Sequence, residues 1–523
     1  MNVAILLAVI GALALGGSRL FVVVGVATLL CFGLYVDADL VTFDRLVTKM
    51  ESLTTKNVFL SIPFFIASGA IMTRGGIAKR LMDFAYALVG WIPGGLAVAA
   101  IVACIVFAAI SGSSPVTLVA VGAVMFPALI SAGFPERFSM GLITSAGSLG
   151  CMIPPAISML IYAISVQGST GGVDPSDLFF AGLLPAFFIA GLLAVYAVWV
   201  GLGVPGSRRP FDVAELGRTF REAAWALSLP VIVLGGIYGG LFTPTEAGAV
   251  AFAAAILVTC VVHRDVPFSA LPSILAEATT LIGSLILIIV LAFGLNDFLA
   301  EVDAPGVIRA WVENADLEAW QFLLLVNLIL IVLGALMDSI SATLVFAPIL
   351  APVAIQHYGF DPIHFGIVFV VNMEIGYLAP PVATNLFVAS AIFRRPFGEV
   401  TRAVLPTLGI ICTALVILMY VPTLSLGPLN WRRGEPIYAA FPWQGGQRGV
   451  DATEGAPGEP AAPTPAPAGH KPTMQEIMAR AKAVREAEAT AAAAGAAGTT
   501  PTPGAEPAAE PTPEARPESK SPP

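Results

Sequence analysis

Two short segments rich in hydroxyl groups interrupt apolar stretches of the chain. They read Ser111-Gly112-Ser113-Ser114-Pro115-Val116-Thr117 and Asp338-Ser339-Ile340-Ser341-Ala342-Thr343. Hydroxyl and carbonyl oxygens suit a hard cation such as sodium, and helix N-termini beside them favour an anion. A carboxylate within an apolar stretch is costly unless it pairs, binds a cation or lines a cavity, so Asp338 is the most informative ionisable residue. The two segments predict a site for small ions.

Two proline pairs, Pro154-Pro155 and Pro380-Pro381, interrupt two other apolar stretches. Proline removes a backbone donor, and the carbonyls that it frees survive at membrane depth only where protein, an ion or a water-filled cavity satisfies them. The alternative is structural, because small residues also let helices pack closely and proline kinks occur without any ligand. The joint occurrence of two hydroxyl-rich segments and two proline breaks favours a pair of sites.

The four interruptions belong to an internal repeat. A shift of 226 residues aligns residues 109–155 with residues 335–381 without a gap, and eleven of the 47 aligned positions are identical. Ser113 then aligns with Ser339, and Gly150 with Gly376. An odd number of expected crossings separates equivalent points, so the copies should have opposite orientations. Inverted repeats with helices broken at corresponding positions indicate a transport site.

The composition requires a bilayer as solvent. Of the 523 residues 57% are hydrophobic and 12% charged, and the mean hydropathy is +0.86. The first segment has no basic start and reads as a retained helix rather than a cleaved signal peptide. Residues 93–130 and 321–356 are too long for one helix, and we read each as a re-entrant hairpin. Ten further crossings are expected at residues 3–16, 20–36, 58–73, 138–165, 178–202, 225–243, 245–262, 272–298, 364–393 and 404–425.

We therefore predict an all-α integral membrane protein with five parts. Basic residues near 74–80, 208–221 and 394–402 mark the cytoplasmic side, and counting from them puts both termini outside. The Pro/Ala-rich composition of the C-terminal tail predicts disorder. The expected parts are N-terminal scaffold helices (1–54), a first inverted repeat (55–203), connecting scaffold helices (204–271), a second inverted repeat (272–428) and the tail (429–523).

Several classes of function are disfavoured. The five cysteines all lie in apolar stretches without metal-ligand spacing, so neither zinc nor redox chemistry is indicated, and no organic cofactor is expected. The net charge is −9 and no basic stripe with interleaved aromatic residues occurs, so nucleic acid is not an expected partner.

The chain resembles the large, DctM-like membrane subunit of the tripartite ATP-independent periplasmic (TRAP) transporters. The resemblance covers nearly all of residues 1–428. It rests on five segments, namely 111–117, 150–155, 243–248, 359–366 with Asp361-Pro362 and His364, and 375–387.

The resemblance implies a multi-pass protein of the bacterial inner membrane that works as a sodium-coupled secondary transporter with an elevator mechanism. It implies two partners, a small four-helix membrane subunit and a soluble periplasmic substrate-binding protein, and a carboxylate as substrate. Sodium is the coupling ion and no enzymatic activity is expected.

The site residues follow from the repeat and the resemblance together. Substrate contacts are expected at Ser111, Ser113, Ser158, Asp338, Ser339 and Asn385. Sodium contacts are expected at Gly112, Ser114, Thr117, Gly150, Pro154, Pro155, Ser341, Thr343, Gly376, Pro380, Pro381 and Thr384. The chain departs from the family at Ala156, where serine is common, and at Ala379, where threonine is common, so each position lacks a hydroxyl.

Two other hypotheses about the function of the chain stay open. A stand-alone symporter of the dicarboxylate or arsenite type shares re-entrant hairpins and needs no binding protein. An intramembrane serine protease could use Ser68 or Ser111, each beside a glycine, but it needs a histidine base at membrane depth. The four histidines (His263, His357, His364 and His470) lie in or near loops.

Two polar residues precede the second proline break, Asn372 and Glu374. They are weaker candidates than Asp338, for packing or for support of the site.

Overall fold

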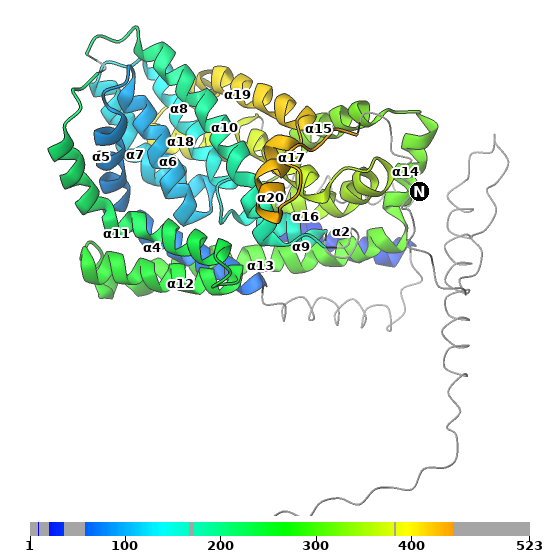
Figure 1. The fold of residues 1–523 in the computed structure, drawn as a ribbon. Coiled ribbons are helices and arrows are strands. Elements are labelled where there is room, and N and C mark those ends of the chain that lie inside the picture. Colours follow the sequence, from blue (N-terminus) through cyan, green and yellow to red (C-terminus); the bar gives the residue numbers. More distant parts are fainter. Residues whose placement is uncertain are drawn as a thin grey trace, which may run out of the picture. The chain divides into compact units, whose positions relative to one another are not determined.

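The computed structural model describes Val9 and residues 20–35, 58–166, 172–206, 208–380 and 383–442. Each regular element in these ranges is a helix (Figure 1). Eight of the helices are long and apolar enough to cross a membrane, or nine if α4 and α5 count as one bent span. The all-helical fold expected from the sequence is therefore confirmed, while the first expected crossing (3–16), apart from Val9, lies outside the described residues.

The two copies of the internal repeat have matching helices. Shifted by 226 residues, each of the four α-helices of the first copy starts within two residues of its counterpart in the second, while the short helices η1 and η4 have no counterparts. The first copy consists of α6 (Gly95–Ser111), α7 (Ser114–Ser131), α8 (Glu136–Ser148), η1 (Leu149–Cys151) and α9 (Ile157–Ser165). The second consists of α15 (Ala319–Leu336), α16 (Ser339–Pro352), η4 (Val353–His357), α17 (Pro362–Leu378) and α18 (Thr384–Phe393).

Contacts between the two copies are reciprocal. The hairpin helix α7 packs against α18 of the other copy, and its counterpart α16 packs against α9. Likewise α8 packs against α19 (Phe397–Tyr420), and α17 packs against α10 (Pro175–Gly201). An exchange of equivalent contacts is the pattern of a pseudo-twofold axis between the copies. This axis brings the four interruptions of the sequence into one region.

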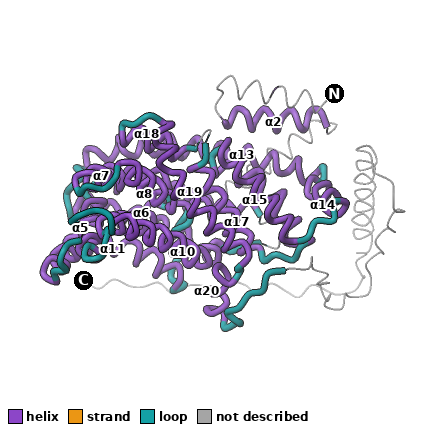
Figure 2. The backbone as a smooth tube through the Cα atoms, turned by 90° about the horizontal axis from the view of Figure 1, so that it is seen from above, coloured by secondary structure: helices purple, strands orange, loops and turns teal. Residues whose placement is uncertain are grey.

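A second group of helices lies along one side of the repeats. Figure 1 shows α4, α12 and α13 there, and Figure 2 shows α2 beside α13. The helix α4 packs against α12 and α13, and it touches the repeats through α6. The members of this group are α2 (Leu20–Tyr35), α4 (Val58–Arg74), α12 (Pro244–Ile256) with η2 (Leu257–Val262), and α13 (Leu271–Glu301), which follows the short η3 (Phe268–Ala270).

Helices α5 (Ile77–Val89) and α11 (Val213–Tyr238) connect this group to the repeats. The break of α4 from α5 at Gly75-Gly76 bends the chain by 75°. Asp265 holds the bend, since its carboxylate accepts bonds from the Arg80 guanidinium at 2.5 and 3.0 Å and from the Gly76 N–H at 3.0 Å. The hydrogen bond from Arg80, helped by that from Gly76, holds the pKa of Asp265 below its usual range.

The helices α14 (Ala304–Asn314) and α20 (Thr423–Arg433) were not among the expected crossings. The boundary expected at residue 428 lies inside α20. Beyond it the ring of Phe441 packs on Tyr420 and Phe360, with centroids 5.4 and 5.5 Å away. Arg433 of α20 pairs with Asp177 at the start of α10 at 2.6 Å. The structured region therefore continues past the point where composition begins to change.

Candidate functional site

The first hydroxyl-rich segment forms a tight turn between α6 and α7. Helix α6 ends at Ser111 and is capped by Gly112, whose φ of +60° is a left-handed conformation that glycine adopts without strain. Thr117 closes the turn, because its hydroxyl lies 2.9 Å from the Ser111 hydroxyl and donates to the carbonyl of Ser113 at 2.9 Å. In this turn, which we call the first tip, the side chains of Ser111, Ser114 and Thr117 are buried; the turn at residues 338–343 is called the second tip.

The first tip lies directly on the first proline break. The N–H of Ile157 donates to the Gly112 carbonyl at 3.2 Å, just after Pro155. A Cβ at Gly112 would lie 2.3 Å from the Pro155 carbonyl oxygen, and one at Gly150 would lie 2.8 Å from the backbone of Ser113. Only glycine permits these backbones to come so close, so close packing explains why glycine occupies both positions.

The second segment is built differently around Asp338. This residue is the N-cap of α16, and its carboxylate accepts from the Ser341 hydroxyl at 2.7 Å and the Ser341 N–H at 3.2 Å. Thr343 repeats the role of Thr117 by donating to the Ser339 carbonyl at 2.6 Å. The side chain of Asp338 remains partly exposed. Each carboxylate oxygen of Asp338 therefore accepts one hydrogen bond from Ser341.

Hydrogen bonds join each tip to a break helix of the other copy. The amide of Asn385, at the start of α18, donates to the Ser114 hydroxyl at 2.6 Å. The Ser158 hydroxyl of α9 lies 3.5 Å from that of Ser339. Ser339 also donates to the hydroxyl of Tyr377, at 2.8 Å. Together with the Ile157–Gly112 bond, these contacts link both tips and both breaks into one assembly, which we call the hydroxyl ring.

One further bond joins aligned positions of the two copies. The buried hydroxyl of Ser148 donates to the Glu374 carboxylate at 2.8 Å, and these two residues are 226 apart. A contact between equivalent residues places this pair near the pseudo-twofold axis. The other oxygen of Glu374 and the side-chain oxygen of Asn385 are buried without a hydrogen-bond partner among the described residues.

The structure brings most of the expected residues together. Of the sodium candidates, Thr384 lies at the start of α18, Pro380 is exposed, and Pro381 lies outside the described residues. Tyr377, which bonds to Ser339, and Ser148 were not anticipated. The repeat alignment carried the signal for Ser148, since it pairs this residue with Glu374; nothing in the sequence singles out the tyrosine.

The donors in this region are chemically suited to sodium. They are hydroxyl, amide and backbone carbonyl oxygens, and the absence of a Cβ at Gly112 and Gly150 lets the first tip and the first break approach each other closely. Within the described ranges no group of three or more His, Cys, Asp or Glu side chains could hold a metal ion. A cation here would therefore be bound mainly by uncharged oxygens, as a hard monovalent ion permits.

Among the residues that the structure describes, neither Ser68 nor Ser111 is hydrogen-bonded to a histidine. The Ser68 hydroxyl donates to the carbonyl of Ala251 at 3.3 Å, and Ser111 bonds to Thr117. His364 contacts another serine, Ser425 of α20, at 2.7 Å. It is buried between α17 and α20, as expected for an interface residue.

Comparisons with known proteins agree with this architecture. The chain is 43% identical over 389 residues to the C4-dicarboxylate TRAP transporter large permease protein DctM of Pseudomonas aeruginosa, covering 74% of this chain and 89% of that protein. It is 41% identical to the same protein of Rhodobacter capsulatus, covering 75% and 91%. The isethionate TRAP transporter permease protein DctMQ of Oleidesulfovibrio alaskensis is 35% identical, covering 79% and 65%.

A solved structure has the same fold. The YdaH transporter of Alcanivorax borkumensis superposes with a TM-score of 0.56 at 13% identity, covering 80% of this chain and 98% of that one.

The family described as the tripartite ATP-independent periplasmic transporter, DctM component, matches residues 3–424. Its members are transporters and not enzymes, so the hypothesis of an intramembrane protease is rejected. The chain therefore belongs to the DctM family of TRAP transporter large membrane subunits.

Proposed function

We propose that this chain is the sodium-coupled permease subunit of a tripartite importer for a small organic anion, with C4-dicarboxylates as the first candidates. The observation that carries the proposal is the hydroxyl ring, which joins two tips and two breaks from both repeats through uncharged oxygens. Relatives more than 40% identical are named for C4-dicarboxylates, which supports this class of solute.

In this proposal the anion lies between the tips. The side-chain hydroxyls of Ser158 and Ser339 and the Asn385 amide would bind its carboxylates. Sodium would occupy the two breaks, held by carbonyls near Pro155 and Gly376 and by tip hydroxyls. Asp338, expected from the sequence among the substrate contacts, would act on the anion through sodium, because its carboxylate would balance the charge of a sodium ion bound beside it.

We further propose that the two hairpins are re-entrant and that the repeats are inverted and move as an elevator. The group α2, α4, α12 and α13 would stay fixed while the repeats move along it. The 75° bend between α4 and α5 supports a joint between the two parts. A small four-helix membrane subunit would complete the fixed part, and a periplasmic binding protein would deliver the anion.

Reconstituted uptake tests the function. Proteoliposomes containing this chain and its small subunit are given radiolabelled succinate, fumarate, isethionate and a sugar acid, with and without the binding protein and an inward sodium gradient. We expect dicarboxylate uptake only when both additions are present. Uptake without the binding protein would favour the stand-alone symporter, and uptake unchanged by replacing sodium with potassium would refute sodium coupling.

A further inference from the structure

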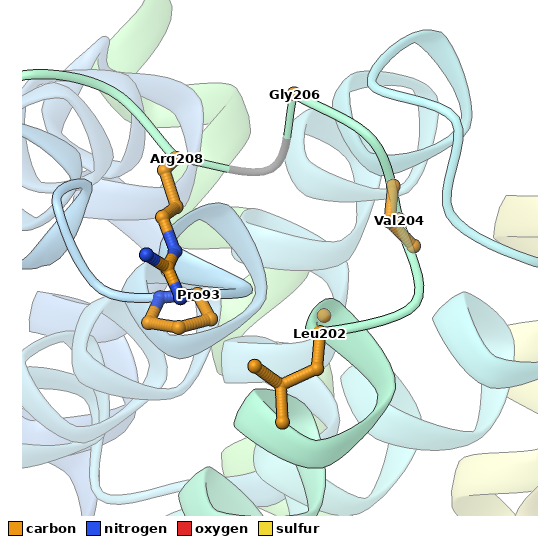
Figure 3. Close-up of a pocket in the computed structure, with 6 residues that line it drawn as sticks. Pro93, Leu202, Val204, Gly206 and Arg208 are labelled. Atoms are coloured by element: carbon orange, nitrogen blue, oxygen red, sulfur yellow. The ribbon is translucent and has the colours of Figure 1, made fainter.

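A small hollow lies at one end of α10, away from the hydroxyl ring. Its volume is about 230 Å³, and Figure 3 shows the side chain of Arg208 extending across it toward Pro93. The walls come from the turn between α5 and α6 and from the segment that follows α10. The lining residues are Pro93, Gly201, Leu202, Val204, Gly206 and Arg208.

Two neighbouring arginines at the hollow have different environments. Arg209 pairs with Glu215 at 2.7 Å and lies over the ring of Tyr86, and its N–H donates to a backbone carbonyl. Arg208 is exposed and has no hydrogen bond or ion pair within the described part of the chain. The nearby carboxylate of Asp212 caps α11 by accepting from a backbone N–H at 2.9 Å. Arg208 thus presents an uncompensated positive charge.

The surroundings place the hollow at the level of lipid headgroups. The 27-residue apolar helix α10 ends at Gly201, beside the hollow. Large apolar side chains are exposed next to it, and tryptophan is typical of the membrane–water interface. These side chains are Trp91, Trp199, Leu202 and Phe211, which are 51–70% exposed. The cluster of arginines in this connection marks it as cytoplasmic.

The base of the hollow is rigid. Gly94 has a φ of +71°, and a Cβ at Gly201 would lie 2.2 Å from the Gly94 Cα. Two backbones in such close contact keep the turn and the end of α10 in one arrangement. A ligand would find the site already formed and would lose little affinity to ordering the protein.

We propose that this hollow binds the phosphate of an anionic phospholipid headgroup in the cytoplasmic leaflet. The guanidinium of Arg208 matches a phosphate in shape and charge. The hollow is below the range of about 300–1,000 Å³ that suits whole small-molecule ligands, whereas a headgroup fills it while the acyl chains run along Trp199 and Leu202. The site is independent of sodium coupling, so either proposal can fail alone.

Native mass spectrometry of the full chain in detergent tests this site. The protein is titrated with phosphatidylglycerol and, separately, with phosphatidylcholine of the same acyl chains. For Arg208→Gln we expect about a fivefold weaker binding of the first phosphatidylglycerol, which corresponds to about 1 kcal/mol for one interfacial arginine. The matched control, Arg221→Gln, removes an exposed arginine of α11 outside the hollow and should leave binding unchanged.

A second variant and a soluble competitor complete the test. Val204→Asp puts a carboxylate in the wall of the hollow and should weaken the binding of phosphatidylglycerol, which has a net negative charge, more than that of zwitterionic phosphatidylcholine. Equal binding of phosphatidylglycerol to wild type and Arg208→Gln would overturn the proposal. Displacement of the lipid by glycerol 3-phosphate at equal concentration would also overturn it, in favour of a site for a soluble phosphate ester.

Discussion

The polar side chains of the two tips form hydrogen bonds within their own helices, and the same side chains are the candidate ligands of the site. Thr117 and Thr343 each donate to a carbonyl one turn earlier, and Asp338 caps α16. The sequence predicts these residues as a group, because hydroxyls and a carboxylate in apolar stretches are conspicuous. It could not separate capping from ligand binding, because both use the same atoms.

Substitutions of Asp338 separate the two roles. Asp338→Ala loses both the cap and the charge, whereas Asp338→Ser keeps a capping oxygen and loses only the charge. If the carboxylate balances bound sodium, both variants should lose uptake by at least about tenfold, since a bond to a charged group is worth about 1.5–3 kcal/mol. The measurement is sodium-driven uptake in proteoliposomes, with membrane insertion checked by gel filtration.

A matched control is available in the same repeat. Asp361 caps α17 by accepting from two backbone N–H groups and lies outside the hydroxyl ring. Asp361→Ala should cost about 1 kcal/mol of stability, and Asp361→Ser should restore most of it without loss of uptake. If Asp338→Ser transports as well as wild type does, capping alone explains Asp338.

At the scale of elements, the expected crossings mostly became helices at the expected places. The proline breaks separate α17 from α18, and α8 with η1 from α9, close to where the repeat alignment put them. The helices α5 and α14 are amphipathic and lack a continuous apolar stretch, so apolar length does not reveal them. The bend at Gly75-Gly76 was missed too, because Asp265, which holds it, is 189 residues away in sequence.

The Asp265 contacts should stabilise the joint between α4 and α5. Asp265→Asn removes a bidentate, partly buried ion pair and should lower the free energy of unfolding by about 1 kcal/mol at pH 7. The pKa of Asp265 is lower in the folded protein, so this stabilisation is complete above its unfolded value of about 3.9 and disappears as the pH falls through the folded value. Thermal unfolding in detergent at several pH values measures both effects.

A neighbouring pair provides the control for this prediction. Arg74 and Glu277 also connect α4 to α13, but both side chains are more than half exposed. Glu277→Gln should change the midpoint of unfolding by much less than Asp265→Asn. A midpoint for Asp265→Asn equal to that of wild type at pH 7 would contradict the role assigned to the contacts.

For the whole molecule, the structured region extends beyond the last apolar stretch. Phe441 is buried against Tyr420 and Phe360, and Thr423 exchanges hydrogen bonds with the backbone of Ala439. Two truncations test this. A chain that stops after Arg433 loses the Phe441 contacts and should unfold more easily by about 2 kcal/mol.

The second truncation is its control. A chain that stops after Gly455 retains Phe441 and ends where the first compact unit ends. It should match the full chain in thermal stability, read by fluorescence-detected gel filtration after heating. Equal destabilisation of both truncated chains would show that residues after 455, and not Phe441, are responsible.

Composition alone predicts a helical protein that spans a membrane, and a fixed shift of 226 residues reveals the duplicated segment. Both are local or periodic properties of the chain. That each tip bonds to the break helix of the other copy, through Asn385–Ser114 and Ser158–Ser339, is evident only from the packed helices. Those pairs are 271 and 181 residues apart, and their meeting depends on how the two copies pack around a shared axis, which no local pattern encodes.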